Sequence, residues 1–315
     1  MAKPMNIMSY NCRGLNDFKK GYLRSLLMRC DVLFIQEHWL SDEQLPILNA
    51  LSTTHSSMGV CGFGSNDVLS GRPYGGCAIF WRQGMCNDVT FVQIDSRRVC
   101  GICCTFSFGK VLFLNSYMPY ECDDASRTEF NNQLGIIEDV LQNYGDCHVV
   151  LGGDFNVDVN RVCANTSALQ EFCGALNLFF DVRHKSYKID YTYHFAMKVF
   201  YSLDHFIMSE ELFTESVCDI HALHEVDNVS DHEPVCLSLD VEYLADNMKA
   251  RSFEPKIAWH KASPDNLSAY RNMLRDQLAS LHIPYSAVTC HDVFCKDPSH
   301  ISALTEYIND MSNGC

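Results

Sequence analysis

The stretch Val149-Val150-Leu151-Gly152-Gly153-Asp154-Phe155-Asn156 decides how the fold of this chain is interpreted. An apolar run ends in two glycines, and a carboxylate and a carboxamide follow two positions apart. A short apolar run bounded by glycine is typical of a buried strand. The pattern therefore predicts a strand that carries Asp154 and Asn156 to the rim of a sheet.

Three other apolar runs also adjoin acidic, amide or histidine side chains. Gln36-Glu37 follows Val32–Ile35, Asp204-His205 follows Tyr201–Leu203, and Ser230-Asp231-His232 precedes Val235–Leu237. Rims of this kind are where metal-assisted phosphate chemistry is commonly built. The four segments together predict one polar site at the edge of a sheet.

The chemistry of this set fits hydrolysis of a phosphodiester bond, which needs a metal, a base for water and a donor to the phosphate. Glu37 offers hard oxygen ligands for Mg²⁺. Asp154 could orient or deprotonate water, and Asn156 could hold a phosphate oxygen. His232 could donate a hydrogen bond to the phosphate while a second acid fixes its tautomer. Each residue alone is more often a turn cap or an ordinary histidine, but the set in chain order favours a functional site.

Strand-like segments outnumber helical ones in the first 241 residues. Strands are predicted at Asn6–Tyr10, Val32–Gln36, Gly76–Trp81, Val89–Ile94, Val99–Phe106, Val111–Tyr117, His148–Leu151, Leu203–Met208 and Val235–Val241. Helical periodicity follows Asp17 and recurs from Asp124 to Tyr144. Several strands follow one another without a helix between them, so the pattern favours two packed sheets with flanking helices over a doubly wound parallel sheet.

The composition is that of an acidic chain that can bury a full core. The 315 residues are 47% hydrophobic and carry a net charge of −15. Neither a signal peptide nor an apolar run of about eighteen residues is present, so we expect an intracellular protein, nuclear or cytoplasmic, without a membrane partner. The 17 cysteines stand mostly alone in apolar runs, which favours free thiols over disulfides.

A domain boundary is predicted near residue 244. The strand pattern stops between Asp240 and Pro264, and the excess of acidic residues ends there as well. We expect a catalytic domain over residues 1–244 and a small helical extension over residues 245–315. Apolar stripes on helices are more often packing surfaces than ligand sites.

One cysteine pair in the C-terminal region has an open interpretation. Cys290 and Cys295, with His291 and His300 nearby, could bind zinc. Four residues separate the two thiols, which is at the loose end of ligand spacing, and no second pair with two intervening residues accompanies them. The spacing therefore leaves both zinc binding and ordinary free thiols open.

Seven segments carry a resemblance to a known family. They are Ser9-Tyr10-Asn11-Cys12-Arg13-Gly14-Leu15-Asn16, Ile35-Gln36-Glu37-His38-Trp39-Leu40, Gly75-Gly76-Cys77-Ala78-Ile79, Asn115-Ser116-Tyr117-Met118-Pro119, Gly152-Gly153-Asp154-Phe155-Asn156, Ser202-Leu203-Asp204-His205 and Ser230-Asp231-His232. In this order the chain resembles the endonuclease/exonuclease/phosphatase superfamily, and most closely the apurinic-like endonuclease domains of LINE-type (non-LTR) retrotransposons. The resemblance implies an α+β fold, a four-layered sandwich of two packed, mostly antiparallel sheets flanked by helices.

The resemblance also implies roles around a metal ion and the phosphate. Glu37 would bind the metal, Mg²⁺ or in its place Mn²⁺, and Asp231 would lie beside it as a second ligand. Asn11 would orient the metal-bound carboxylate, and Tyr117 would position the phosphate.

A second group of roles concerns the attacking water and the imidazole. Asp154 with Asn156 would handle the water, and Asp204 would buttress His232. Thr192 matches the threonine that lies ahead of the Ser-x-x-Asp-like segment in these elements. His232 would then stay protonated at neutral pH beside its carboxylate neighbours.

Abasic-site repair enzymes carry an acidic residue two positions after the asparagine that corresponds to Asn11. This sequence has Arg13 at that position and so departs from their pattern. The departure favours the retroelement branch, and Arg13, Lys185 and Thr192 would contact DNA. The implied function is Mg²⁺-dependent nicking of DNA that leaves a 3′-hydroxyl end, as in target-primed retrotransposition.

Residues 245–315 resemble the stretch before a reverse transcriptase, so an element RNA or a polymerase is an open possibility as partner. The net charge predicts weak, salt-sensitive DNA binding.

Two alternatives remain open on the sequence. A phosphatase or a sphingomyelinase-like hydrolase would share the fold and the acid, amide and imidazole set. A catalytically silent, retroelement-derived binding protein would share only the fold. The intact Glu37, Asp154, Asn156 and His232 argue against the silent protein.

Overall fold

Apolar runs of the sequence form two six-stranded sheets in the computed structural model. The first sheet has the order β13 (Val217–Ala222), β14 (Val235–Leu239), β1 (Met5–Asn11), β2 (Val32–Gln36), β4 (Cys77–Arg82) and β3 (His55–Val60). The second has the order β5 (Asp88–Phe91), β6 (Val99–Phe106), β7 (Gly109–Tyr117), β8 (His148–Asp154), β12 (Asp204–Ser209) and β9 (Leu178–Phe180). A separate hairpin pairs β10 (Tyr193–Phe195) with β11 (Val199–Tyr201).

The structure describes residues 4–64, 73–196, 198–240, 263–280, 283–290, 292 and 295–314. The chain divides into two compact units, Met1–Lys256 and Ile257–Cys315. The boundary predicted near residue 244 lies outside the described residues, as does His291. Each unit is therefore described by itself.

The two sheets share one arrangement of strand directions. Each has a single parallel pair at its centre, β1 with β2 in the first and β7 with β8 in the second, and all other pairs are antiparallel. Parallel strands end at the same rim, so Asn11 lies opposite Gln36 and Tyr117 lies opposite Asp154. Asp204 at the start of β12 also lies opposite Asp154. The register thus gathers the polar strand ends that the sequence singled out.

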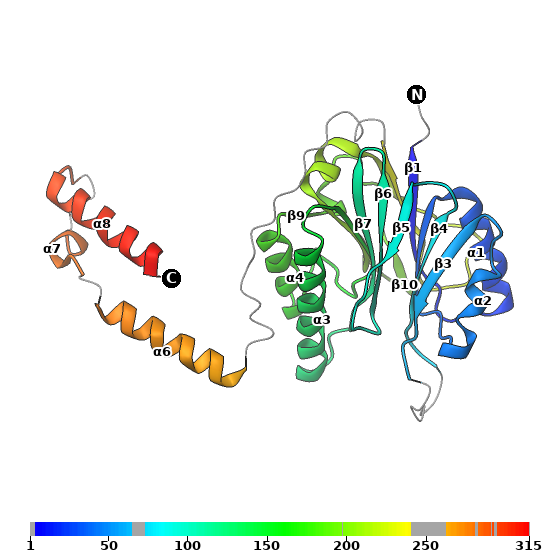
Figure 1. Cartoon of the computed structure of the whole chain (residues 1–315), viewed down its shortest axis with the longest axis horizontal. Coiled ribbons are helices and arrows are strands. Elements are labelled where there is room, and N and C mark those ends of the chain that lie inside the picture. The colour runs from blue at the N-terminus through cyan, green and yellow to red at the C-terminus, as the bar shows by residue number, and fades with distance from the viewer. Residues whose placement is uncertain are drawn as a thin grey trace. The chain divides into compact units, whose positions relative to one another are not determined.

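Helices cover the two outer faces of the sheet pair. They are α1 (Asp17–Arg29), α2 (Pro46–Asn49), α3 (Asp124–Asn143) and α4 (Ala164–Ala175), with short turns at η1 (Asp42–Gln44), η2 (Asp181–Arg183) and η3 (Leu212–Ser216). Figure 1 shows α3 and α4 on one side of the sheets and α1 and α2 on the other. Asn16 begins α1, since its side chain accepts a hydrogen bond from the Lys19 amide at 3.0 Å. The predicted α+β sandwich is confirmed.

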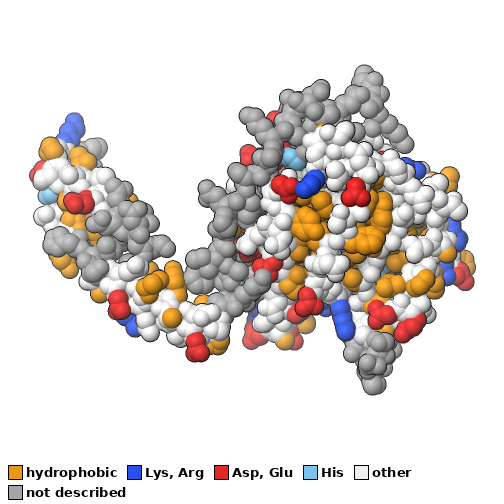
Figure 2. All heavy atoms as spheres, in the orientation of Figure 1, with side chains coloured by type: hydrophobic (Ala, Val, Ile, Leu, Met, Phe, Trp, Pro, Cys, Tyr) orange, Lys and Arg blue, Asp and Glu red, His pale blue; other side chains and the backbone are white. Residues whose placement is uncertain are grey.

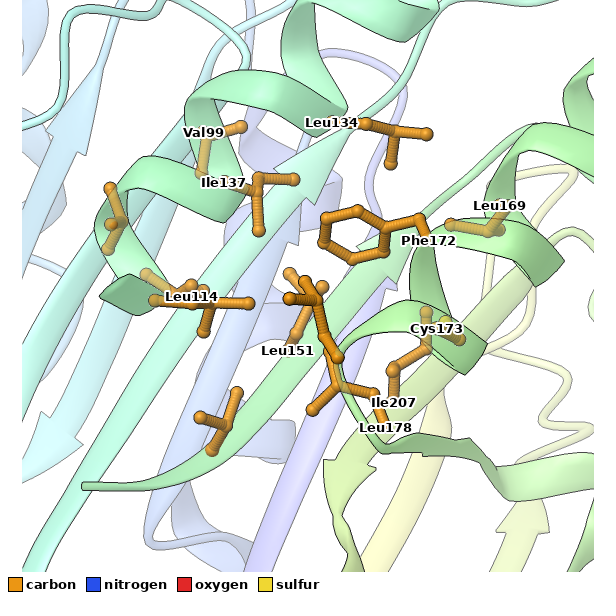
Figure 3. Packing of buried hydrophobic residues seen from close by; sticks show 14 of the residues in the cluster. Val99, Leu114, Leu134, Ile137, Leu151, Leu169, Phe172, Cys173, Leu178 and Ile207 are labelled. Carbon is orange, nitrogen blue, oxygen red and sulfur yellow. The ribbon is translucent and has the colours of Figure 1, made fainter. Parts of the chain in front are cut away.

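Three apolar clusters fill the spaces between these layers. One lies between the two sheets and includes Phe34, Phe113 and Phe206. A second joins the second sheet to α3 and α4, and Figure 3 shows Ile137 and Phe172 from these helices packed toward the strands. The third joins α1 to the first sheet. Burial on both faces explains why the strands read as nearly continuous apolar runs.

Several strands were not expected from the sequence. β3, β9, β13 and the β10–β11 hairpin are short or partly polar, and β3 and β13 lie at the two edges of the first sheet. Edge strands bury only part of their surface, so their sequences lack a clear apolar pattern. No helix in the described part of the chain is long and apolar enough to cross a bilayer.

The second unit is helical and has little interior. Its helices are α6 (Pro264–Ser280), α7 (Tyr285–Val288) and α8 (Pro298–Gly314). Ala287 is its one buried apolar residue among those whose side chains are described, whereas Tyr285, Ile301 and Ile308 are exposed. Figure 2 shows hydrophobic side chains at the surface of these helices. The prediction that the C-terminal region is a small helical extension is confirmed by these three helices.

Candidate active site

Asn11, at the end of β1, joins two acids that are distant in sequence. Its side-chain nitrogen donates to Glu37 Oε1 at 3.0 Å and to Asp154 Oδ2 at 2.9 Å. The Asn11 oxygen accepts the Arg13 amide at 3.0 Å, and Ser230 Oγ donates to the Asn11 carbonyl at 2.8 Å. All polar groups of this buried asparagine are therefore engaged, and its orientation is determined by three strand ends.

The backbone is strained at the same rim. Positive φ angles of 45° at Arg13, 54° at Glu37, 60° at Trp39 and 52° at Asn156 place four non-glycine residues in the left-handed region. Such conformations cost about 1–3 kcal/mol each and tend to occur where side chains are held for function. The strained backbone turns the chain sharply after β1, β2 and β8.

His232 lies between two carboxylates. Its Nδ1 is 2.9 Å from Asp204 Oδ2, and its Nε2 is 3.8 Å from Asp154 Oδ2. The Thr192 hydroxyl accepts hydrogen bonds from the backbone amides of Leu203 at 2.9 Å and Asp204 at 3.0 Å. Thr192 is fully buried, so its side chain positions the start of β12.

The pKa values of this trio are coupled. Burial lowers the pKa of His232, but Asp204 and then Asp154 outweigh burial and raise it to about 10. Burial, followed by the charge of Asp204, raises the pKa of Asp154 to about 7, although His232 and Asn11 act against the rise. At neutral pH the imidazole is therefore cationic, with Nδ1–H directed at Asp204 and Nε2–H available to an anion.

Asn156 and Tyr117 occupy the rim beside Asp154. The Asn156 amide donates to Asp154 Oδ1 at 2.9 Å, and its side-chain nitrogen donates to the Met118 carbonyl at 2.9 Å. Burial raises the pKa of Tyr117, and the charges of Glu37 and Asp154 raise it further, so the phenol keeps its proton. The Arg98 guanidinium lies 5.4 Å from the centre of the Tyr117 ring.

A cleft of about 790 Å³ opens over this site. Six of the predicted residues line it, namely Arg13, Glu37, Asp154, Asn156, Asp231 and His232. Arg127 and Arg161 also line it, where they pair with Glu121 at 3.4 Å and Asp158 at 3.3 Å, and four rings, Tyr120, Tyr193, Phe195 and Tyr201, add aromatic surface. Arginine beside exposed aromatic rings is a combination that suits a nucleic-acid strand.

The predicted DNA contacts differ in their surroundings. Arg13 lines the cleft and forms an ion pair with Asp231, so each partly neutralises the other. Lys185 is exposed but does not line the cleft, and Thr192 is buried. Among the neighbouring lysines, Lys188 is held by Asp219 at 2.6 Å.

The side chains of this rim fit a divalent cation. Glu37 faces the cleft, and its oxygens accept hydrogen bonds from Asn11 Nδ2 and from the Trp39 indole, each at 3.0 Å. Carboxylate oxygens have further lone pairs that can bind a metal. Asp231 Oδ1 is buried and has no hydrogen-bond partner in the described structure. Asp154, Asp204 and His232 also bring ligand atoms within 4.8 Å of one another, but a cationic imidazole between two carboxylates repels a metal. Glu37 and Asp231 therefore keep carboxylate oxygens with unused lone pairs.

Three contributors to the site were not expected from the sequence. The Trp39 indole orients Glu37, and the Tyr193 ring lies 4.8 Å from the His232 ring. Ser230 supports both Asn11 and the His232 amide, the latter at 3.3 Å. Trp39 and Ser230 belong to the quoted motifs, in which they are close in sequence to Glu37 and His232, and this closeness could have indicated a role in the site. No sequence pattern indicates a role for Tyr193.

The sequence profile of the Endonuclease/Exonuclease/phosphatase family matches residues 8–232. The chain belongs to this family. Family membership, together with the fold, supports a metal-dependent hydrolase that acts on phosphodiester bonds. No curated protein gives a significant match.

Solved structures agree with the fold. A Neisseria 3′ phosphatase bound to a product DNA hairpin matches with a TM-score of 0.57 and 19% identity, covering 75% of this chain and 99% of that chain. An AP endonuclease from Archaeoglobus fulgidus matches with a TM-score of 0.59, 16% identity and coverage of 75% and 99%. AP endonuclease LMAP from Leishmania major matches with a TM-score of 0.60, 15% identity and coverage of 75% and 87%.

Proposed function

We propose that this protein is a DNA endonuclease that nicks one strand and leaves a 3′-hydroxyl end, with Mg²⁺ as its metal and Mn²⁺ as a substitute. The observation that carries the proposal is the convergence of an acid, an amide and a cationic imidazole on one cleft. Glu37, Asp154, Asn156 and His232 all line it. Family membership supports the reaction class, and the arginines and rings of the cleft support a nucleic-acid substrate.

The roles of the residues follow from their contacts. Asp154, ionised above a pH of about 7, is the base that takes a proton from the attacking water. Water oxygen bonds to phosphorus, the bond from phosphorus to the 3′ oxygen breaks, and that oxygen leaves with a proton from solvent. His232 donates from Nε2 to a phosphate oxygen, and Asn156 orients the water or the phosphate.

Glu37 and Asp231 would hold the cation. A bound divalent ion would neutralise charge that builds on the phosphate. Asn11 keeps the Glu37 carboxylate at its place relative to Asp154, since one amide nitrogen contacts both acids. Arg13 competes with a cation for Asp231, so DNA that draws Arg13 onto a phosphate would release Asp231 for the metal.

We further propose that the chain comes from the retroelement branch of the family. Arg13 stands where resembling repair enzymes carry an acid, and its ion pair with Asp231 changes the charge balance of the rim. A retroelement nickase must produce an end that a polymerase can extend. The 3′-hydroxyl product is therefore part of the proposal.

A plasmid assay tests the function. Supercoiled DNA should become open circular with Mg²⁺ and stay supercoiled with EDTA, and the nicked end should be extended by a DNA polymerase without prior phosphatase treatment. Asp154→Asn and His232→Ala should each lower the rate at least about a hundredfold. Asp146→Asn is the matched control, because this exposed acid pairs with Lys110 at the opposite end of β8.

The same assay separates the alternatives. If the plasmid stays supercoiled while a phosphomonoester is hydrolysed in Mg²⁺, the protein is a phosphatase of this fold. If neither substrate reacts but DNA binds, the silent binding protein is correct. Equal nicking by wild type and Asp154→Asn would mean that the site is misassigned.

A further inference from the structure

The second unit brings two thiols and an imidazole together, and none of the three residues is among those that line the cleft. Cys290, Cys295 and His300 offer ligand atoms that all lie within 4.8 Å of one another. Both cysteines are free thiols, and all three residues are partly exposed. The catalytic proposal uses none of them.

The distance between two of these atoms matches a tetrahedral metal site. Cys295 Sγ lies 3.5 Å from His300 Nδ1. Zinc bonds of about 2.3 Å to sulfur and about 2.05 Å to nitrogen, at a tetrahedral angle, place the two ligand atoms about 3.6 Å apart. The atoms are therefore already at the separation that a shared zinc ion requires.

The local backbone holds the ligands in place. Cys290 follows α7, where its amide donates to the Ala287 carbonyl at 3.4 Å. The Cys295 amide donates to the Asp292 carbonyl at 3.1 Å. Asp297 accepts the Ser299 amide at 2.9 Å at the start of α8, and His300 lies in the first turn of that helix. Two thiols close in sequence, followed by a histidine on a helix, are a common ligand set of small zinc sites.

The stability of the unit also calls for a covalent or metal constraint. Ala287 is its one buried apolar residue among the described side chains, and Tyr285 is 69% exposed. Units of fewer than about 70 residues with so little core usually depend on disulfides, metals or a partner. A metal bound by Cys290, Cys295 and His300 would supply this constraint, because its binding free energy adds to folding free energy.

We propose that Cys290, Cys295 and His300 bind a structural Zn²⁺ ion in the C-terminal unit. Binding releases the two thiol protons to solvent, and thiolates favour zinc over Mg²⁺. The fourth position of the tetrahedron is taken by water or by one further side chain. The proposed nicking reaction uses none of the three ligands.

Cobalt substitution of the full chain tests this site. The protein is kept reduced, stripped with a chelator and titrated with Co²⁺ in excess Mg²⁺. Wild type should show thiolate-to-cobalt charge-transfer absorption and the visible bands of tetrahedral cobalt, with about one ion bound through sulfur and displaced by Zn²⁺. The catalytic cleft cannot produce this thiolate absorption through Glu37 or Asp231.

Variants make the result specific to the three ligands. Cys290→Ser and Cys295→Ser should each weaken cobalt binding by more than about a hundredfold, above the loss typical of outer-shell partners. Cys218→Ser is the matched control, since this exposed cysteine lies on β13 of the first unit. His300→Cys should keep the ion and strengthen the charge-transfer absorption, which excludes simple unfolding as the cause of loss.

Several results would contradict the zinc site. Reduced wild type without thiolate absorption would overturn it, as would equal loss in Cys218→Ser. A Cys290–Cys295 disulfide that persists under reduction, with no bound metal, would identify a redox link instead of a zinc site. Nicking should be unchanged in Cys290→Ser, so failure of the zinc site and failure of the nuclease proposal remain distinguishable.

Discussion

At the scale of single residues, Asp204 sets the charge of the site. It touches His232 at 2.9 Å, and its charge raises the pKa of both His232 and Asp154. Its Oδ1 is buried and has no hydrogen-bond partner in the described structure. Because an unpaired buried carboxylate oxygen is costly, Asp204 acts on the electrostatics of its neighbours at a cost in stability.

Asp204→Asn should shift the pH profile of nicking toward lower pH. In wild type the rate should rise as Asp154 loses its proton near pH 7 and fall as His232 loses its proton near pH 10. Removing the Asp204 charge lowers both pKa values, so both limbs should move in the same direction while the maximum rate falls at least about tenfold. A pH–rate series and an NMR titration of the imidazole measure the two effects.

Asp190→Asn controls for loss of an ordinary Asp–His contact. Asp190 pairs with His224 at 2.8 Å on an exposed surface, so this variant should keep the wild-type profile. If only the maximum rate of Asp204→Asn changes and both limbs stay in place, Asp204 acts by packing and the electrostatic account is wrong.

At the scale of elements, the parallel pair β7–β8 depends on Gly153. Its φ is +143°, and a Cβ at this position would lie 1.9 Å from the Ser116 carbonyl oxygen of the neighbouring strand. Backbone atoms of a central strand cannot move aside without breaking the ladder. Gly153 therefore lets β8 approach β7 closely and bring Asp154 beside Tyr117.

Gly153→Ala should lower the free energy of unfolding by at least about 3 kcal/mol, because backbone strain and overpacking add. Urea unfolding measured by circular dichroism gives the change. Gly21→Ala is the matched substitution, since no atom lies within 4 Å of its added Cβ in α1, and it should stabilise by up to about 1 kcal/mol. A Gly153→Ala protein as stable as wild type would contradict the close approach of the two strands.

At the scale of the whole molecule, the charge of −15 limits how DNA can bind. With about two or three phosphate contacts, affinity should fall about 10- to 40-fold between 50 and 200 mM salt. Arg13→Ala should reduce the slope of log affinity against log salt by about one unit. Lys185→Ala should have a smaller effect, since Lys185 does not line the cleft.

Fluorescence anisotropy with a short duplex measures these slopes. Equal effects of the two substitutions would place Lys185 among the contacts, as the sequence alone predicted. Affinity that is flat across the salt series would remove nucleic acid as the substrate and favour the phosphatase.

A chain that ends at Glu242 should stay folded and keep nicking. All residues that line the cleft lie before this position, and the three apolar clusters belong to the first unit. Solubility, circular dichroism and the plasmid assay check the result, and the shortened chain should lose the thiolate–cobalt absorption. Loss of both solubility and cleavage would mean that the boundary near residue 244 is misplaced.

The sequence alone predicted the two-sheet sandwich and six of the residues that line the cleft. Central strands buried on both faces must be apolar throughout, so runs such as Val149–Leu151 mark them without any tertiary information. The polar residues that follow these runs, including Glu37 and Asp154, stand out because they break the apolar pattern. The motifs that resemble the family contain these same residues, in the same order along the chain.

Only the tertiary structure decided how these residues act on one another. Sheet register places Asn11 between Glu37 and Asp154, and it sets Arg13 against Asp231, which the sequence had assigned to separate roles. The sequence also did not predict edge strands such as β3. It did not predict that Thr192 is buried. Contacts between segments far apart in the chain depend on packing and on desolvated charge, and neither is encoded in a local pattern of residues.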